Sequence, residues 1–365
     1  MPASLESILG YIPLTRAIQT VQSGIPKVLP EKFYTPSPGA RVLGDKARNI
    51  SYKGTRQVAR VVPYGSPPRQ IVHMPRSSTD VRLLHASEVM VIEHELLMVL
   101  RQLEEHAAQD RARAEIVYQA QAAGQRFDNL RVAAIHSMLA FGKIWLDVNG
   151  QLLNSASGAD LVIDYGIPST NTGGINPGSG NLIDASWATA STNIVTHVNR
   201  IKKYAIQKTG FPLKYAFYGV NVPGYLANND QFKYYLARNP GMNQRFIDTG
   251  RIDGEYIELT WIPVYNGFYE DASGSILEPF PADQVVFTPE ITDDIYQLYE
   301  GSYPVPKSIQ IAASIEAQLD NVVNIYGRAG WSEMTSRLAL SQIYVDTFLP
   351  RLMNPDTIFL ADTTP

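Results

Sequence analysis

The stretch LRVAAIHSMLAFGKIWLDVNGQLL, residues 130–153, contains the change of hydrophobic period on which the fold prediction rests. Up to Ala140 its apolar residues recur every three or four positions, which is the period of an amphipathic helix. From Lys143 onward two short apolar runs are separated by Asn149-Gly150, a dipeptide that suits the two-residue type I′ turn of a β-hairpin. The stretch therefore predicts a helix that leads directly into a hairpin.

The helix is expected to begin well upstream of this stretch. No proline occurs between Thr79 and Ala140, and Thr79 or Asp80 is a suitable N-cap. Gly124 is expected to bend or interrupt the helix, because glycine weakens a helix interior. Two segments stacked nearly end to end would span about 75 Å over roughly 50 residues, the length of a structural strut. Apolar residues recur near helical spacing at Val89, Ile92, Leu96, Val99, Leu100, Leu103, Ile116, Val117, Phe127, Leu130, Ile135, Met138 and Leu139.

A candidate β-ribbon precedes the helix. Residues 56–62 and 69–74 are predicted to be strands, and PYGSPP at 63–68 is predicted to be the turn between them. Neither strand has a clean apolar face, and an isolated two-stranded ribbon is marginally stable in water. We therefore expect the ribbon to lie on the core of this chain or on another copy of it.

Residues 1–44 are predicted to form a poorly packed arm. Prolines at positions 26, 30, 36 and 38 interrupt regular structure repeatedly, although the apolar residues near the start could form a brief helix. Such an arm is either a disordered terminus or a strap that folds against a neighbour.

Beyond the hairpin the sequence predicts a third strand and then a second domain. The strand covers residues 161–165, and residues 166–181, rich in Gly, Pro, Asn and Ser, are predicted to be a linker. The second domain would contain a helix over 187–209, a strand over 214–218, one or two helices over 221–239, and strands over 256–265 and 284–288. Strands over 322–326 and 357–361, with a helix or irregular run between them, are expected to return to the sheet begun near Trp145, which would make the second domain an insertion.

Composition excludes several classes of protein. The chain has 365 residues, of which 45% are hydrophobic and 18% charged, with 20 Tyr, no Cys and a formal charge of −4. The absence of Cys excludes disulfides, thiolate metal sites and a cysteine nucleophile. The slightly acidic balance gives no reason to expect tightly held nucleic acid. We see no secretion signal and no apolar run long enough to span a bilayer, so a soluble protein is expected.

Charge is unevenly distributed along the chain. Basic residues dominate residues 27–82, whereas acids dominate residues 253–320, where Lys307 is the single base. Such asymmetry can pair one part of a molecule with another copy. The alternative is that both regions are solvated or that they meet within one subunit.

No catalytic constellation is found in the sequence. His94-Glu95 resembles the start of a zinc-protease motif, but Met98 stands where the second His is required. The six histidines are therefore interpreted as surface or helix-face residues. The glycine-rich residues 174–180 lack the Lys-Ser/Thr of a phosphate-binding loop, and no Gly-x-Ser-x-Gly sequence occurs. We predict no catalytic, cofactor-binding or metal-binding residue, and no enzyme activity.

An ordered set of short motifs resembles one family of viral shell proteins. The set comprises Gly54-Thr55 before the ribbon with Pro63 at its tip, Gly142-Lys143, Val162-Ile163-Asp164-Tyr165-Gly166, Trp187, Tyr218-Gly219, Phe348-Leu349-Pro350, Pro355-Asp356 and Phe359-Leu360-Ala361-Asp362. With the predicted order of elements, it resembles the Hong Kong 97-like capsid fold of tailed bacteriophages. More narrowly, it is similar to the lambda-type (E family) major capsid proteins.

This resemblance implies an α+β fold with an N-terminal arm, an extended β-ribbon loop, a long spine helix, a peripheral sheet and an inserted axial α/β domain. On this chain the arm would be residues 1–44, the extended loop 45–78 and the peripheral domain with the spine helix 79–181. The axial domain would be residues 182–306, and residues 307–365 would return to the peripheral domain.

The resemblance also implies function by assembly. Copies would form pentamers and hexamers of an icosahedral head around double-stranded DNA, in the host cytoplasm and then in the virion. The expected partners are the chain itself, a scaffolding protein, a portal and, in some heads, a decoration protein, with weak non-specific contact to DNA, no cofactor and no membrane. The candidates for contact between subunits are Arg56, Arg60, Pro63, Tyr64 and Arg69, and we hypothesise that Arg56, Arg60 and Arg69 meet acids of residues 253–320 in an adjacent copy.

Three alternatives remain. A cellular nanocompartment shell that holds an enzyme as cargo would have the same fold. A soluble hydrolase that uses the acidic second domain is disfavoured by the lack of a nucleophile–base pair. A tail-tube or fibre protein is disfavoured by the long helix and the inserted domain.

Overall fold

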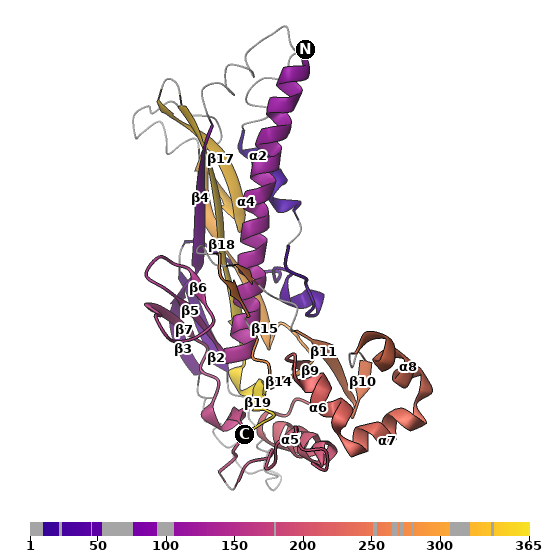
Figure 1. The fold of residues 1–365 in the computed structure, drawn as a ribbon. Helices are drawn as coiled ribbons and strands as arrows, with labels where there is room; N and C mark the ends of the chain where they lie inside the picture. Colours follow the sequence, from indigo (N-terminus) through magenta and orange to yellow (C-terminus); the bar gives the residue numbers. More distant parts are fainter. Residues whose placement is uncertain are drawn as a thin grey trace, which may run out of the picture.

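The computed structural model describes residues 10–21, 24–44, 46–52, 76–92, 106–178, 180–250, 254–264, 269–270, 274–278, 280–306, 322–336 and 339–365. The molecule is elongated: one long helix runs beside a narrow sheet in the upper part, and an α/β unit lies below (Figure 1). The helices are α2 (Tyr11–Gln19), α4 (His106–Phe141), α5 (Ile194–Thr209), α6 (Val222–Asn228), α7 (Asp230–Arg238) and α8 (Pro240–Thr249), with 3-10 turns η1 (Glu31–Phe33), η2 (Ser169–Asn171) and η3 (Pro355–Thr357).

The strands form two larger sheets and three small ones. They are β1 (Arg41–Val42), β2 (Lys46–Tyr52), β3 (Arg76–Arg82), β4 (Leu84–Ile92), β5 (Lys143–Leu146), β6 (Leu152–Leu153), β7 (Leu161–Asp164), β8 (Thr172–Gly173), β9 (Leu213–Tyr218), β10 (Gly254–Tyr256), β11 (Leu259–Pro263), β12 (Tyr269–Glu270), β13 (Ile276–Leu277), β14 (Gln284–Pro289), β15 (Tyr296–Pro306), β16 (Val322–Tyr326), β17 (Arg328–Ser336), β18 (Ala339–Leu352) and β19 (Phe359–Asp362). Mixed helix and sheet content confirms the α+β class.

Helix α4 is the longest element, with 36 residues, or about 54 Å at 1.5 Å per residue. The prediction that it begins near Thr79 was wrong, because residues 76–92 form strands β3 and β4. The apolar spacing of residues 84–92 fits both periods, but in the structure burial alternates along β4 from Leu84 to Ile92. The prediction that Gly124 interrupts the helix was also wrong, because α4 continues without a break from His106 to Phe141.

The upper sheet is built around β18. Its first part lies between β4 on one side and β17 on the other, and its last part pairs with β15. Strand β15 continues into pairs with β1 and β16. The prediction of a helix or irregular run between residues 326 and 357 was therefore wrong, because β17 and β18 occupy most of that stretch.

The predicted hairpin after α4 is confirmed, with a different turn. Strands β5 and β6 pair through Leu146 and Leu152, so the loop has five residues rather than two. Gly150 has a φ of +78° and its N–H donates to the carbonyl of Asp147, while the Asp147 carboxylate accepts from the N–H groups of Asn149 and Gln151. Strand β7 also pairs with β5, as expected for a third strand.

The lower sheet has the strand order β10-β11-β9-β14-β19-β8. The expectation that residues 322–326 and 357–361 return to the sheet near Trp145 was wrong: β16 pairs with β15, and β19 lies between β14 and β8 in the lower sheet. Phe359 and Ala361 of β19 are fully buried in that core, which explains the placement. Helix α5 begins at Ile194 rather than 187, with Asn193 as its N-cap. Residues 166–181, predicted to be a linker, include β8 and the fully buried Ile175.

The N-terminal arm packs on its own subunit over residues 10–21 and 24–44, so the expectation of poor packing was wrong there. Apolar side chains before, between and after its prolines are buried against α4 and the sheets, and they are Leu14, Ile18, Ile25, Leu29, Phe33 and Ala40. Prolines exclude long regular elements, but they do not exclude burial of the residues between them.

Strands β2 and β3 pair with each other in antiparallel register, from Lys46 opposite Arg82 to Tyr52 opposite Arg76. The two predicted ribbon strands, 56–62 and 69–74, lie outside the described residues. Among the helices that the structure describes, none is both long and apolar enough to cross a membrane.

Candidate functional site: the junction of arm, helix and sheet

The arm helix α2 closes one edge of the upper sheet. Thr15 Oγ1 accepts a hydrogen bond from the N–H of Gly330 on β17 (3.1 Å) and donates to the carbonyl of the same residue (3.3 Å). Gln19 Nε2 donates to the carbonyl of Arg328, two residues away on the same edge (3.1 Å). Side chains of α2 therefore satisfy main-chain groups that a further strand would otherwise bind.

Two glycines leave room for α2. A Cβ atom at Gly124, in the middle of α4, would lie 2.8 Å from the carbonyl oxygen of Ile18. A Cβ atom at Gly330 would lie 3.3 Å from Cβ of Leu14 and 3.0 Å from the ring of Tyr344. Gly124 is thus a point of close approach between two helices rather than a break.

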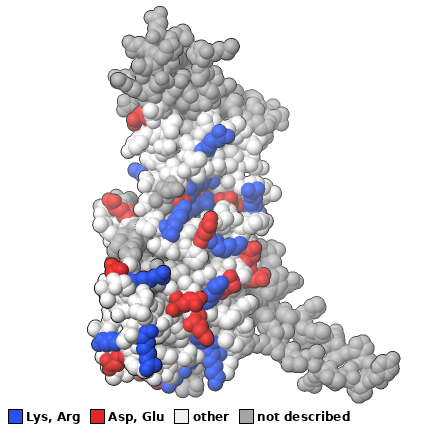
Figure 2. Space-filling view, turned by 90° about the vertical axis from the view of Figure 1, so that its right-hand side faces the viewer, with Lys and Arg blue, Asp and Glu red and all other residues white. Residues whose placement is uncertain are grey.

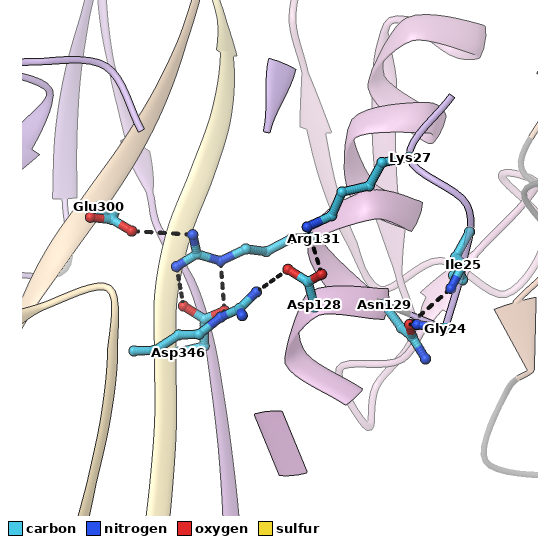
Figure 3. Close-up of polar contacts among 9 residues, drawn as sticks. Gly24, Ile25, Lys27, Asp128, Asn129, Arg131, Glu300 and Asp346 are labelled. Atoms are coloured by element: carbon cyan, nitrogen blue, oxygen red, sulfur yellow. Dashed lines mark hydrogen bonds and ion pairs between the residues drawn. The ribbon is translucent and has the colours of Figure 1, made fainter. Parts of the chain in front are cut away.

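A buried network of charges joins α4 to β18 and β15 (Figure 3). Arg131 donates from Nε and Nη2 to the two carboxylate oxygens of Asp346, at 2.7 and 2.5 Å, and from Nη1 to Glu300 at 3.1 Å. Its guanidinium also lies over the ring of Phe348. The Asp346 side chain is fully buried and that of Arg131 is 9% exposed. Bidentate pairing of this kind offsets part of the cost of removing both charges from water.

The network continues to the arm. Arg328 on β17 donates to Asp346 (3.2 Å) and to Asp128 on α4 (2.6 Å), and Lys27 of the arm pairs with the second oxygen of Asp128 (2.8 Å). Burial opposes ionisation of Asp128, but hydrogen bonds from Lys27 and Arg328 outweigh it and hold the pKa of that carboxyl below its usual value. Next to Lys27, the N–H groups of residues 24 and 25 donate to Asn129 of α4 (Figure 3).

A cavity of about 280 Å³ opens beside this network. Its lining comprises Gln19, Tyr34, Arg41, Asp128, Arg131, Val132, Ile135, Leu298, Glu300, Tyr326 and Arg328. The charged members that line it are mostly paired with one another, as described above. The cavity lies within the junction, and its lining contains no Ser, Thr or Cys side chain of the kind that commonly acts as a nucleophile.

The arm also covers a buried histidine. His136 of α4 is fully buried, and its Nε2 lies 3.4 Å from the hydroxyl of Tyr34 in the arm. Burial lowers the pKa of His136 to about 4 and raises that of Tyr34, so both side chains are neutral near pH 7. The histidines were interpreted as surface or helix-face residues; His136 and His197, which is 3% exposed, are not at the surface but lie on buried faces of α4 and α5.

In the lower unit, His197 anchors the start of α5. Trp187 Nε1 donates to His197 Nδ1 (3.1 Å), so the proton of the neutral ring lies on Nε2, which donates to Asp184 Oδ1 (2.7 Å). Arg200 binds the other oxygen of Asp184 (2.8 Å). An indole occupies the side of the imidazole where a hydrolase would need a hydroxyl, so this carboxylate–imidazole pair is structural. Among the described residues, no group of acids and histidines could hold a metal ion.

Comparison with known families decides the class of the protein. The family model of phage major capsid protein E matches residues 14–300 of the chain. The chain belongs to this family. It is a family of structural head proteins and not a class of enzymes, so the hydrolase alternative is not favoured.

Solved structures similar to this capsid protein share little sequence with it. A phage-related protein from Bordetella bronchiseptica RB50 has 8% identity and a TM-score of 0.49, with 97% of each chain covered. A protein of the satellite phage P4 procapsid has 12% identity and a TM-score of 0.44, covering 100% of this chain and 92% of its own. A protein of Gordonia phage Cozz has 9% identity and a TM-score of 0.44, covering 94% and 91%. No curated protein matches the chain.

The five contact residues predicted from sequence, Arg56, Arg60, Pro63, Tyr64 and Arg69, lie outside the described residues of the capsid protein. Basic and acidic side chains are interspersed over the middle and lower parts of the face in Figure 2. Several acids of residues 253–320 pair within the subunit: Glu258 with Lys202, Glu290 with Lys214, Asp293 with Lys32 and Glu300 with Arg131. These four acids therefore pair with bases of their own subunit, which was the alternative to pairing with an adjacent copy.

The buried network of the capsid protein was missed by sequence reasoning. Arg131 and Asp346 are 215 positions apart, and neither belongs to a recognisable motif. The one local signal was a charged residue on the apolar face of the helical pattern, since Arg131 lies four residues after Phe127 and four before Ile135.

Proposed function

We propose that this capsid protein assembles, through pentamers and hexamers, into an icosahedral phage head that encloses double-stranded DNA. The match of the family model over residues 14–300 is the observation that supports the proposal. The family is one of phage heads, which favours this function over a cellular nanocompartment.

We further propose that the chain has the domain organisation of the Hong Kong 97-like fold. The lower sheet with α5–α8 would be the axial domain at the centre of each pentamer or hexamer. Helix α4 with the upper sheet would be the peripheral domain, and residues 45–78 would be the extended loop that reaches a neighbour. The buried network and the arm would keep α4 and the upper sheet together as one body when the head changes shape.

The proposed partners are other copies of the chain, a scaffolding protein and a portal, with a decoration protein where the head carries one. Contact with DNA would be weak and non-specific, which the formal charge of −4 supports. Assembly would take place in the host cytoplasm and end in the virion.

Arg56, Arg60 and Arg69 are proposed to meet acids of an adjacent copy. Glu255 and Glu278 are exposed and have no ion pair within the part of the chain that the structure describes, so they are the acids to test. Reversing Arg60 to Glu should reduce the yield of particles, and reversing Glu255 to Lys in the same chain should restore it if the two meet. A double variant that assembles no better than either single one would contradict this pairing; each exposed pair contributes only about 0–1 kcal/mol.

Electron microscopy of the purified protein, made alone and together with its scaffolding protein, tests the main proposal. Closed particles of uniform size with fivefold vertices are expected. A chain that stays monomeric under all conditions would overturn the proposal. A closed shell that contains an enzyme of the host and no DNA would instead support the nanocompartment.

A further inference from the structure

The two edges of the upper sheet differ in how they are covered. Strand β17 forms one edge, where Thr15 and Gln19 of α2 bind its main-chain groups. Strand β4 forms the other edge and pairs with β18 over all nine of its residues. Within the described residues nothing pairs with the outer side of β4, which lies at the margin of the upper part in Figure 1.

The bonds to Thr15 fix the direction of the main-chain groups across the sheet. The N–H and the carbonyl of Gly330 both hydrogen-bond to the Thr15 hydroxyl, so both groups point away from β18. In an antiparallel sheet its partner, Tyr344, must then turn its own groups toward β4, where Glu88 is opposite. The N–H and carbonyl groups of the alternate residues Ser87, Val89 and Val91 therefore point outward, away from the sheet.

Strand β4 lacks most of the features that protect an exposed edge from strand pairing, and its one charged residue, Glu88, is turned toward α4. Natural edge strands are commonly short or carry Lys, Pro or a bulge. Strand β4 has nine residues, LHASEVMVI, with no Lys, Arg, Pro or Gly. By contrast, the edge strands of the lower sheet, β8 and β10, have two and three residues. A long, unprotected edge is a template for a strand of another chain.

Side chains on this edge are also suited to a contact. Val89 and Val91 are 61% and 62% exposed, although both are β-branched residues that favour burial in sheets. The one acid of β4, Glu88, faces the opposite side and pairs with Arg126 of α4. At the lower end, His85 bonds to Thr347 and stacks on Tyr303, which closes that end. The surface that remains open is formed by Ser87, Val89 and Val91, and these three residues carry no charge.

A second copy of this chain is the occupant that fits. The chain belongs to a family of major capsid proteins, and a shell is built from many copies of its major protein, so another copy is the most abundant partner available to an exposed edge. An uncharged edge can contact the same protein without like-charge repulsion, whereas a basic or acidic edge would require a partner of opposite charge.

We propose that residues 87–91 of β4 form a strand-pairing contact with a second copy of the capsid protein in the assembled head. The contact uses the outward N–H and carbonyl groups of Ser87, Val89 and Val91, with the two valines covered by the neighbour. This inference rests on the proposed function, because it requires that copies assemble.

Hydrogen–deuterium exchange of the unmodified protein tests the contact directly. In free subunits the outward amides of residues 87, 89 and 91 should exchange fast, whereas those of 86, 88 and 90, bonded to β18, should be protected. In closed particles the outward amides should slow by about a hundredfold or more. If they exchange equally fast in closed particles and in free subunits, the inference is overturned while the proposed function stands. If no particles form, the proposed function fails, and the inference with it.

A matched pair of proline substitutions tests the same contact by mutation. Val89→Pro removes an outward N–H and is compatible with an edge strand, so the free subunit should melt within about 2 °C of the wild type. Glu88→Pro removes a bond to β18 and should destabilise the subunit. In an assembly assay Val89→Pro should lower the yield of closed particles by about tenfold or more, the effect of losing one hydrogen bond in each contact.

Two results with the proline variants would overturn the inference. One is a normal yield of particles from Val89→Pro. The other is a subunit destabilised by Val89→Pro as much as by Glu88→Pro, because the N–H of residue 89 would then point inward. Tyr118→Lys changes a side chain that is 67% exposed on α4 and serves as the control for a general effect of altering the upper part.

Discussion

The two parts of helix α4, residues 106–127 and 128–141, have different surroundings. In the first part, Ile116, Ala120 and Phe127 pack against the upper sheet and α2, while Tyr118 is 67% exposed. In the second part every residue from 131 to 140 is buried. The first part is amphipathic, with one side in water, whereas the second is enclosed by the sheets and the arm. The enclosed part therefore holds the buried charges and should dominate the stability of the subunit.

The largest difference between the two parts is expected for arginines that pair with acids. Arg131→Ala leaves Asp346 buried without its main partner and should lower the free energy of unfolding by about 3–5 kcal/mol. Arg126→Ala, in the first part, removes a residue whose side chain is 73% exposed and whose contact with Glu88 is 3.5 Å, and it should cost less than about 1 kcal/mol. Denaturant unfolding of free subunits measures both. Equal losses would show that enclosure by the arm does not matter.

The next effect concerns pH and His136. Its pKa is lowered to about 4 in the fold, whereas an unfolded histidine has a pKa of about 6.5, so protonation favours the unfolded chain. The contribution of the neutral His136 to the free energy of unfolding is complete above about pH 6.5. It falls by about 1.4 kcal/mol per pH unit as the pH is lowered to about 4. His136→Gln should flatten this part of the stability profile, which titration of unfolding midpoints against pH would show. Protonation of the carboxylates of the network destabilises the subunit only at lower pH, so they do not account for this slope. A slope that is unchanged in the variant would contradict the assignment to His136.

The crossing of α2 over α4 gives a smaller effect. Gly124→Ala puts a Cβ atom 2.8 Å from the carbonyl oxygen of Ile18, so α2 must move, at a cost of about 1–3 kcal/mol. Gly241→Ala, in α8, meets no atom within 4 Å and should instead stabilise by about 0.5–1 kcal/mol, as alanine does in a helix. Opposite signs of the two changes in melting temperature would confirm that Gly124 serves the crossing.

The smallest effect is expected on the exposed side of the first part, residues 106–127. Tyr118→Ser should change the unfolding free energy by less than about 0.5 kcal/mol, because the side chain is largely in water. Phe127→Ala, on the buried side of the same part, should cost about 3–5 kcal/mol. A comparable loss at both positions would mean that the first part is also enclosed.

Local signals in the sequence predicted the elements with a clear period. The C-terminal part of α4, the hairpin after it and strands β7, β9, β14 and β16 were placed close to their observed positions. Residues 84–92 were assigned to the wrong class because Val89 and Ile92 fit a helical pattern together with the apolar residues that follow, while pairing with β18, about 250 positions away, decides the strand.

Partners far apart in the chain could not be predicted. The arm was recognised from its prolines, but nothing local shows that α4 offers Gly124 and Asn129 to receive it. The buried network joins residues on four elements, and apart from the charges within the apolar pattern of α4 nothing in the sequence distinguishes its members from solvated charges. The five predicted contact residues of the ribbon remain a prediction. The resemblance to lambda-type capsid proteins gave the family correctly because it used the order of motifs rather than any one of them.

The position of β19 has a consequence for how the protein is made. The strand inserts between β14 and β8, with Phe359 and Ala361 in the centre of the lower core. A ribosome releases every other strand of that sheet before residues 359–362, so the lower core stays unfinished until those residues have been synthesised. A growing chain that still lacks β19 therefore cannot present a complete lower unit to another copy.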